Sequence, residues 1–271
     1  MPYEDFTTYT EVDPNNHITI ASATHIDADL YMNEDAHVYK DAGVGHFGNF
    51  EHKEDGQFVA YSAEGVYREG NIWFLANEIN DGKYFDDNLL NYLQLAFGRT
   101  AANASFLGLG ARDSSNKYTD TYAPSTGVWY YNTIQRSGTT LTCKIYSDSA
   151  RTNLLDTLSV TCPTTTFRYI YASNTRNAAA ARYVTVDVEN LDLQEVIEKI
   201  VSDSAVGVES LLKLRNLATI ADSGVCAEVV SRSQREMILT DLGAGAESVD
   251  KLRNVALIYD SGVGTEIVSR P

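Results

Sequence analysis

The sequence predicts a mainly β protein, with an antiparallel β-sandwich over residues 1–192 and a small repeat domain of strand-turn units over 193–271. Three observations support this prediction. Short segments with strand composition follow one another from about residue 5 to 191, separated by turn signals. Two of these segments alternate like the strands of a half-buried hairpin. Four copies of a 19-residue pattern fill the rest of the chain.

The predicted strands are rich in β-branched and aromatic residues, and glycine, asparagine and aspartate mark the turns between them. They cover residues 17–23, 35–40, 45–53, 56–63, 71–78, 104–112, 128–136, 139–147, 154–161, 167–173 and 182–191. So many short strands favour a sandwich or jelly roll. The segment 86–97 leaves two alternatives open, because its three leucines and Phe97 suit either a helix face or a long buried strand.

The clearest local structure is a hairpin formed by residues 128–136 and 139–147. Its turn reads "RSG", and Gly138 supplies the positive φ angle that such a turn requires. Because side chains alternate along a strand, Trp129 is expected on one face of the sheet and Tyr130 on the other. The second strand has alternate apolar residues, which predicts one buried and one exposed face.

The sequence of this hairpin resembles that of a known family. The stretch "VWYYNTIQRSGTTLTCKIYSD", followed by "LLDTLSV", resembles the central hairpin of the concanavalin A-like, laminin-G-like lectin and glucanase jelly roll. Upstream, "NEDAHVYKDAGVGHFGNFEHK" is similar to the early strands of such domains in phage and environmental viral proteins. The resemblance covers about residues 5–192. It implies a two-sheet sandwich of a kind that binds carbohydrate on surfaces, including virion surfaces.

Enzymes of the resembled class carry their carboxylates as Glu-x-Asp-x-Glu on one strand face, and this sequence lacks that run. The nearest pair is Asp187 and Glu189, which share a strand face but have a different spacing and fall where the sandwich is predicted to end. We therefore predict a protein that is not an enzyme. A glycan-active hydrolase with an atypical carboxylate pair is the alternative.

Four aromatic residues are candidates for stacking on sugar rings, because such rings bury a large area at a low entropic cost. Tyr118 and Tyr122 lie in the polar segment 113–127, which is predicted to be a long loop. Trp129 and Tyr130 belong to the predicted hairpin. Packing in the core is the competing interpretation for each of them.

Two acidic stretches are candidates for a calcium site. Asp27 and Asp29 alternate onto one strand face, and Asp81 and Asp86 lie in an acidic segment at 81–88. Paired carboxylates are common in a chain with 37 acidic residues, so a solvated face is the competing interpretation. The sequence therefore predicts no required cofactor and leaves calcium open.

The charge of the chain bears on its partners and its location. A net charge of −16 repels phosphate backbones and anionic lipid surfaces, so nucleic acid is not an expected partner. No apolar run is long enough for a membrane span, which predicts that the chain does not insert into a bilayer. The first ten residues lack the features of a Sec signal. The expected location is a virion surface or the extracellular space, reached without such a signal.

The repeat is defined by columns that recur every 19 residues. An aspartate opens each copy, a glutamate follows six positions later and a cation ten positions later. The signature residues are Asp203, Asp222, Asp241 and Asp260, with Glu209, Glu228, Glu247 and Glu266. The i,i+4 charge pairs suit short helices at 208–216 and 246–254, whereas the β-branched copies suit strands. A mixture of both is expected, and calcium binding at the aspartates stays open.

A 19-residue unit cannot bury its own apolar face, so neighbouring units must cover one another. We expect residues 193–271 to form a stalk or assembly module that contacts sister subunits or other virion and surface proteins. The expected function is a non-enzymatic virion-surface or cell-surface attachment protein with a lectin-like head that binds glycan. A purely architectural capsid or filament subunit is a further alternative.

Overall fold

A computed structural model of the chain describes residues 3–62, 67–114 and 116–195, together with eight strands within 199–269. Side chains are described as far as Gln194. The chain divides into two compact units, Met1–Gln194 and Glu195–Pro271. Each unit is described by itself below.

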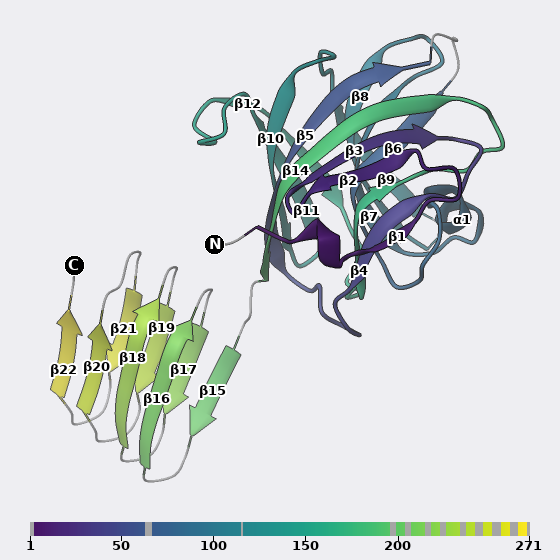
Figure 1. Cartoon of the computed structure of the whole chain (residues 1–271). Helices are drawn as coiled ribbons and strands as arrows, with labels where there is room; N and C mark the ends of the chain where they lie inside the picture. Colours follow the sequence, from purple (N-terminus) through teal and green to yellow (C-terminus); the bar gives the residue numbers. More distant parts are fainter. Residues whose placement is uncertain are drawn as a thin grey trace. The chain divides into compact units, whose positions relative to one another are not determined.

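The first unit contains two seven-stranded antiparallel sheets (Figure 1). In spatial order, the first sheet consists of β1 (Thr10–Val12), β4 (His37–Asp41), β13 (Tyr169–Asn174), β6 (Arg68–Ala76), β7 (Tyr92–Arg99), β8 (Ser105–Asp113) and β9 (Asn116–Tyr122). The second consists of β12 (Leu154–Thr161), β11 (Thr140–Tyr146), β10 (Trp129–Ser137), β5 (Phe50–Tyr61), β14 (Tyr183–Glu195), β3 (His25–Tyr31) and β2 (Ile18–Ser22). This is the sandwich that the sequence predicts.

The predicted hairpin is present in the middle of the chain. Strands β10 and β11 pair antiparallel from Tyr131 opposite Tyr146 to Ser137 opposite Thr140. Gly138 in the turn has a φ of 57°, a conformation in which a side chain would be strained. The expected faces of this hairpin are confirmed, because Tyr130 is buried while Trp129 lies on the opposite, partly exposed side.

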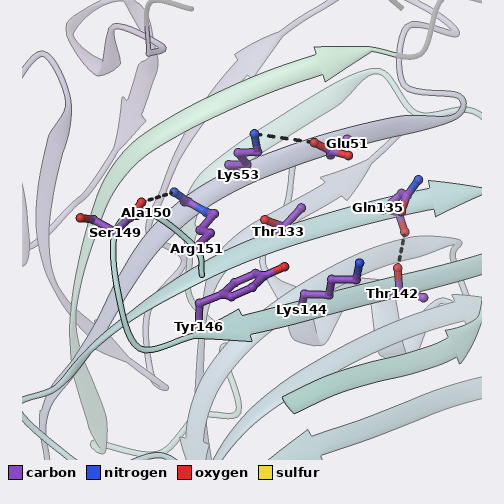
Figure 2. A pocket seen from close by; sticks show the side chains of 10 residues that line it. All are labelled: Glu51, Lys53, Thr133, Gln135, Thr142, Lys144, Tyr146, Ser149, Ala150 and Arg151. Carbon is purple, nitrogen blue, oxygen red and sulfur yellow. Dashed lines mark hydrogen bonds and ion pairs between the residues drawn. The ribbon is translucent and has the colours of Figure 1, made fainter. Parts of the chain in front are cut away.

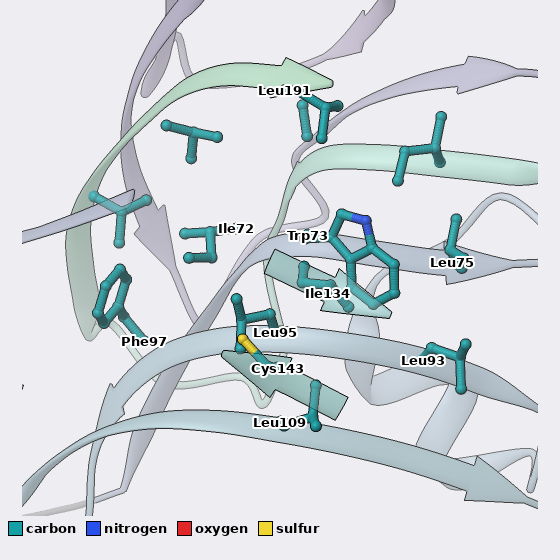
Figure 3. Close-up of a cluster of buried hydrophobic side chains, with 14 of the residues drawn as sticks. Ile72, Trp73, Leu75, Leu93, Leu95, Phe97, Leu109, Ile134, Cys143 and Leu191 are labelled. Carbon is teal, nitrogen blue, oxygen red and sulfur yellow. The ribbon is translucent and has the colours of Figure 1, made fainter. Parts of the chain in front are cut away.

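The main core lies between the two sheets and takes apolar side chains from both (Figure 3). Trp73 of β6 and Leu95 of β7 come from the first sheet, and Ile134 of β10 and Cys143 of β11 come from the second. All four are fully buried, and burying a side chain of this size contributes about 1.5–3 kcal/mol. Cys143 and Cys162 are free buried thiols.

A short row of polar groups crosses this core at β5 and β10. The indole nitrogen of Trp73 donates to Nδ1 of His52 at 3.1 Å, and Nδ2 of Asn132 donates to Oε1 of Glu54 at 3.2 Å. The other carboxyl oxygen of Glu54 is buried without a partner among the described atoms. Burial raises the pKa of Glu54 well above its ordinary value, an effect that the Asn132 hydrogen bond offsets and the Asp55 charge reinforces.

A second apolar cluster covers the outer face of the first sheet. The short helix α1 (Gly82–Asp87) packs Phe85 against Phe74 of β6 and Tyr92 of β7. Asp81 caps this helix, since its side chain accepts from the backbone N–H groups of residues 83 and 84. A 3₁₀ turn, η1 (Phe6–Thr8), stands near the start of the chain. No helix in the described residues has the length and apolar character of a bilayer span.

Three predicted regions differ from the structure. The strands predicted at 45–53 and 56–63 are one continuous strand, β5. Residues 86–97 form neither one helix nor one strand: they contain the end of α1, a turn in which Leu89 has a φ of 55°, and the start of β7. Residues 113–127 contain the edge strand β9, where a long loop is predicted. Pairing with β8 satisfies the backbone groups along one side of β9. The polar composition of this edge strand resembles that of a loop, so the sequence does not reveal the pairing.

The second unit contains two four-stranded parallel sheets. One sheet holds β15 (Lys199–Asp203), β17 (Ala218–Asp222), β19 (Met237–Asp241) and β21 (Ala256–Asp260). The other holds β16 (Gly207–Leu214), β18 (Cys226–Ser233), β20 (Ala246–Asp250) and β22 (Thr265–Ser269). Each repeat contributes one strand to each sheet, so the chain follows the path of a parallel β-helix with one repeat per coil (Figure 1).

The repeat signature stacks in register along these sheets. Each signature aspartate is paired with the next one along its sheet, and the glutamates form a second ladder in the other sheet. The helices expected at 208–216 and 246–254 are a wrong prediction, because β16 and β20 occupy the described part of those segments. Pairing with an identical neighbouring coil outweighs the few tenths of a kcal/mol that i,i+4 charge pairs contribute.

Candidate functional site

The second sheet has a polar outer face. Side chains that alternate with the buried core residues on β11, β10, β5, β14 and β3 point away from the sandwich interior. We call this surface the polar face. Where β11, β10 and β5 are adjacent, its side chains form three cross-strand rows: Glu51, Gln135 and Thr142; Lys53, Thr133 and Lys144; Asp55, Tyr131 and Tyr146.

A hollow of about 410 Å³ lies on this part of the polar face (Figure 2). Its floor is formed by residues of the three rows, and the loop 147–153 closes one side with Ser149, Ala150 and Arg151. Asp148 holds this loop, because its carboxylate accepts from the backbone N–H groups of Thr152 and Asn153. The hollow therefore has a rigid floor and one wall of fixed shape.

Charged side chains in and beneath the hollow form two ion pairs. Nζ of Lys53 lies 3.7 Å from the Glu51 carboxylate, and Nη2 of Arg151 lies 2.6 Å from Oδ1 of Asp55. The Arg151 guanidinium also donates to the backbone oxygens of residues 54 and 132. Lys144 is exposed and makes no ion pair or hydrogen bond with any residue that the structure describes. The lining thus presents cationic, hydroxyl and amide groups to solvent.

An acidic group lies further across the polar face, on β3 and β14. Pairing of these strands sets Asp187 opposite Asp27 and Glu189 opposite His25. Nε2 of His25 is 2.8 Å from Oδ1 of Asp27, and Nδ1 is 3.1 Å from Oε1 of Glu189. Although β14 is the last strand of the sandwich in sequence, it lies between β5 and β3 inside the sheet. The pair Asp187 and Glu189 therefore lies on the last strand of the sandwich in sequence, as expected, but in the interior of the sheet in space.

Asp27 and Asp187 form a close carboxyl pair on neighbouring strands. Partial burial, together with the charge of Asp27, raises the pKa of Asp187 to about 6. A hydrogen bond between the two carboxyl groups favours the protonated form, whereas His25 opposes the shift. Such a pair contains both a proton donor and a proton acceptor at and below about pH 6. One ligand atom each from His25, Asp27 and Asp187 lies within 4.8 Å of the others, so these residues also have the chemistry to hold a divalent cation.

The predicted aromatic residues divide between the two sides of the sheet. Trp129 lies on the polar face, where its ring meets His25 edge-on at 6.4 Å. Tyr130 is 3% exposed and packs in the core, so it offers no surface to a sugar. Tyr118 and Tyr122 on β9 also pack against the core, because this edge strand turns its aromatic side chains toward the sandwich interior.

The predicted acidic residues are placed in three different environments. Asp27 and Asp29 share the polar face, and Asp29 accepts a hydrogen bond from Oγ1 of Thr185 at 2.5 Å. Asp81 is occupied as the cap of α1 and also accepts from the backbone N–H of Asn177. Asp86 lies on the other side of the sandwich, apart from Asp27 and Asp29. These four residues therefore do not converge on one site.

Asp86 is the centre of a cation cluster. Its two carboxylate oxygens lie 2.9 Å from Arg112, 3.0 Å from Lys117 and 2.9 Å from Arg176, and the hydroxyl of Tyr92 donates to it at 2.7 Å. Burial alone would raise the pKa of Asp86. The three cations and the hydroxyl outweigh burial and hold that pKa well below its ordinary value. Asp86 thus neutralises one buried cation, Arg112, and two cations that are partly exposed.

The residues that line the hollow were not predicted from sequence motifs. Lys53, Thr133, Lys144 and Tyr146 are single residues on three strands, with no spacing pattern that singles them out. The signal that could have found them is the alternation of the predicted hairpin, which places Thr133 on the same face as Trp129.

Comparison with known proteins identifies fold similarity alone. No family model and no curated protein matches the chain. A functionally unknown protein from Saccharomyces cerevisiae is similar with a TM-score of 0.47 and 11% identity, over 70% of this chain and 98% of that one. A legume lectin-like domain from Entamoeba histolytica has a TM-score of 0.47 and 12% identity, over 69% and 90%.

An alginate lyase from Klebsiella pneumoniae has a TM-score of 0.39 and 10% identity, over 65% of this chain and 75% of that one. Similarities of this degree transfer neither a ligand nor an activity to this chain.

Proposed function

We propose that the sandwich unit binds carbohydrate in the hollow of its polar face, without acting on it chemically. The observation that carries this proposal is a solvent-facing hollow of about 410 Å³ on a regular sheet, a volume in the range of small-ligand sites. Hydroxyl groups of Thr133 and Thr142 and the amide of Gln135 offer donors and acceptors. Tyr146 adds an aromatic ring at the same place.

The test is a binding panel of soluble polysaccharides, measured by calorimetry on the full chain and on Tyr146→Ala. Loss of the ring is expected to weaken binding about tenfold, since an aromatic contact is worth about 1 kcal/mol or more. Tyr84→Ala is the matched control, because Tyr84 lies on α1 against the other sheet. A panel without a binder, or equal affinities for both variants, would contradict the proposal.

We further propose that the unit serves attachment on a virion or cell surface, with the repeat unit as its stalk or assembly module. Two compact units and two parallel sheets built from repeats support this division of labour. Light scattering should then give an oligomer for the full chain and a monomer for a chain ended after Glu195. The same number of chains per particle for the two proteins would remove the assembly role.

A second candidate function is glycan hydrolysis, and one observation favours it. The carboxyls of Asp27 and Asp187 lie close together on the polar face, and the pKa of Asp187 is raised to about 6. Retaining glycosidases use two carboxyls about 5 Å apart, one protonated and one ionised. The same polysaccharide panel decides between the candidates: product release that disappears in Asp187→Asn would favour the hydrolase, and binding without product favours the lectin-like function.

A further inference from the structure

We propose that the ligand of the hollow is an anionic polysaccharide, one whose sugars carry carboxylate or sulfate groups. This inference rests on the carbohydrate-binding function proposed above and names the class of glycan. It depends on the local sign of charge, on the spacing of two lysines and on the absence of strong partners for them among the described residues.

The sign of charge in the hollow is opposite to that of the chain. The sequence has 37 acidic and 21 basic residues, which makes a surface patch of this protein negative by default. In and directly beneath the hollow stand three cations, Lys53, Lys144 and Arg151, against the two carboxylates of Glu51 and Asp55. The hollow therefore has a surplus of one positive charge. An anionic ligand is favoured there, whereas the rest of the negatively charged surface repels it.

The two lysines flank a single residue. Thr133 on β10 is opposite Lys53 of β5 on one side and Lys144 of β11 on the other. Adjacent strands are about 4.8 Å apart, so the lysine backbones stand about 10 Å apart across the strand between them. All three side chains line the hollow (Figure 2). An acidic group of a ligand above Thr133 can therefore accept a hydrogen bond from the Thr133 hydroxyl. It can also form ion pairs with the two lysines, one on each side.

Both lysine charges are available to a ligand. The ion pair of Lys53 with Glu51, at 3.7 Å, is longer than a charge-assisted hydrogen bond, so it can be exchanged for a better acceptor. Lys144 has no partner within the described part of the chain. Arg151 differs, because its contact with Asp55 at 2.6 Å fixes the guanidinium in the wall of the hollow. Lys53 and Lys144 are thus the residues that select for negative charge.

The experiment compares the full chain with the double variant Lys53→Gln/Lys144→Gln, which removes both charges and keeps a polar side chain one atom shorter. The probes are polygalacturonate, dextran sulfate and unsubstituted dextran, each titrated at low and at high salt. The control is Lys83→Gln, a lysine on α1 paired with Asp87 outside the polar face. Thermal unfolding of each variant confirms that it is folded.

We expect at least one of the two anionic polymers to bind, with an affinity that falls at high salt and falls about tenfold or more in the double variant. The Lys83→Gln control should keep its affinity. The stronger of the two anionic polymers identifies carboxylate or sulfate as the group recognised.

Three results would overturn the inference. Binding of dextran as tight as that of the anionic polymers would leave the proposed function in place and remove the selectivity for charge. Anionic binding that is unchanged in the double variant would place the selectivity elsewhere on the molecule. No binding by any polymer would remove the proposed function together with this inference.

Discussion

Replacement of Asp86 by asparagine is expected to lower the free energy of unfolding by about 3 kcal/mol at pH 7. Asp86 is 11% exposed and neutralises Arg112, Lys117 and Arg176. Removal of the carboxylate charge leaves three cations close together without a counterion, and Arg112 among them is buried. A cost of this size is typical when one partner of a buried ion pair is lost, because the remaining charge is desolvated without compensation. Urea denaturation of both proteins measures the difference.

The effect should depend on pH. Because the pKa of Asp86 is held well below its ordinary value, its contribution to stability is present above the pKa of an unfolded aspartate. It is lost as the pH falls toward the lowered pKa, so the two proteins should converge in acid. The control is Asp87→Asn, since Asp87 is 59% exposed and pairs only with Lys83 among the ion pairs described. That change should alter stability by about 0.5 kcal/mol or less. An Asp86→Asn protein as stable as the Asp87→Asn protein would show that the cations need no counterion.

Replacement of Glu54 by glutamine is expected to stabilise the protein by about 2 kcal/mol at pH 8 and to leave its stability at pH 4 nearly unchanged. Glutamine has the shape of a protonated glutamate and can accept the same hydrogen bond from Asn132. It cannot ionise, so it removes the cost of keeping a proton in the core.

The direction follows from the raised pKa of Glu54. Its favourable contribution is complete below the pKa of an unfolded glutamate and is lost as the pH rises toward the raised folded pKa. Within that window the unfolded chain releases a proton that the folded protein keeps, and stability falls by about 1.4 kcal/mol per pH unit. Asp187 adds a loss of the same sign up to about pH 6, so the variant should keep a smaller slope.

Urea denaturation from pH 4 to pH 8.5 measures both slopes. Glu11→Gln on β1 is the control, because Glu11 is exposed and its replacement changes the net charge by the same amount. A Glu54→Gln protein that is less stable than the wild type at pH 8 would show that Glu54 is ionised in the fold. A stability difference between the two proteins that does not change with pH would lead to the same conclusion.

Local features of the fold were predictable from the sequence because they depend on neighbours along the chain. The alternation around Trp129 and Tyr130 assigns the two faces of β10 correctly, and the turn at Gly138 assigns the pairing of β10 with β11. Hairpin strands need only a short loop between them, so composition and turn chemistry are sufficient. The assignment of the polar face as one continuous surface needs the strand order as well, which the sequence does not contain.

Most contacts of the candidate site could not be predicted from the sequence, because they depend on the order of the strands in the sheets. Asp27 and Asp187 are directly opposite on β3 and β14, yet 160 positions separate them in the chain. Asp86 meets Arg112 and Arg176 only after β7, β8 and β13 have paired. Tyr118 was assigned to a loop because β9 is polar, and a polar edge strand has the composition of a loop.

Because every coil has the same register, the length of the repeat unit can change only by whole coils. Every coil pairs with the next through the same positions, as Asp222 does with Asp241 and Glu228 with Glu247. Insertion or removal of 19 residues therefore adds or removes one rung in each sheet, about 4.8 Å, and leaves every remaining pair intact. A change by a number of residues that is not a multiple of 19 would shift the register of both ladders at once. The repeat unit can thus be lengthened or shortened only in increments of one coil.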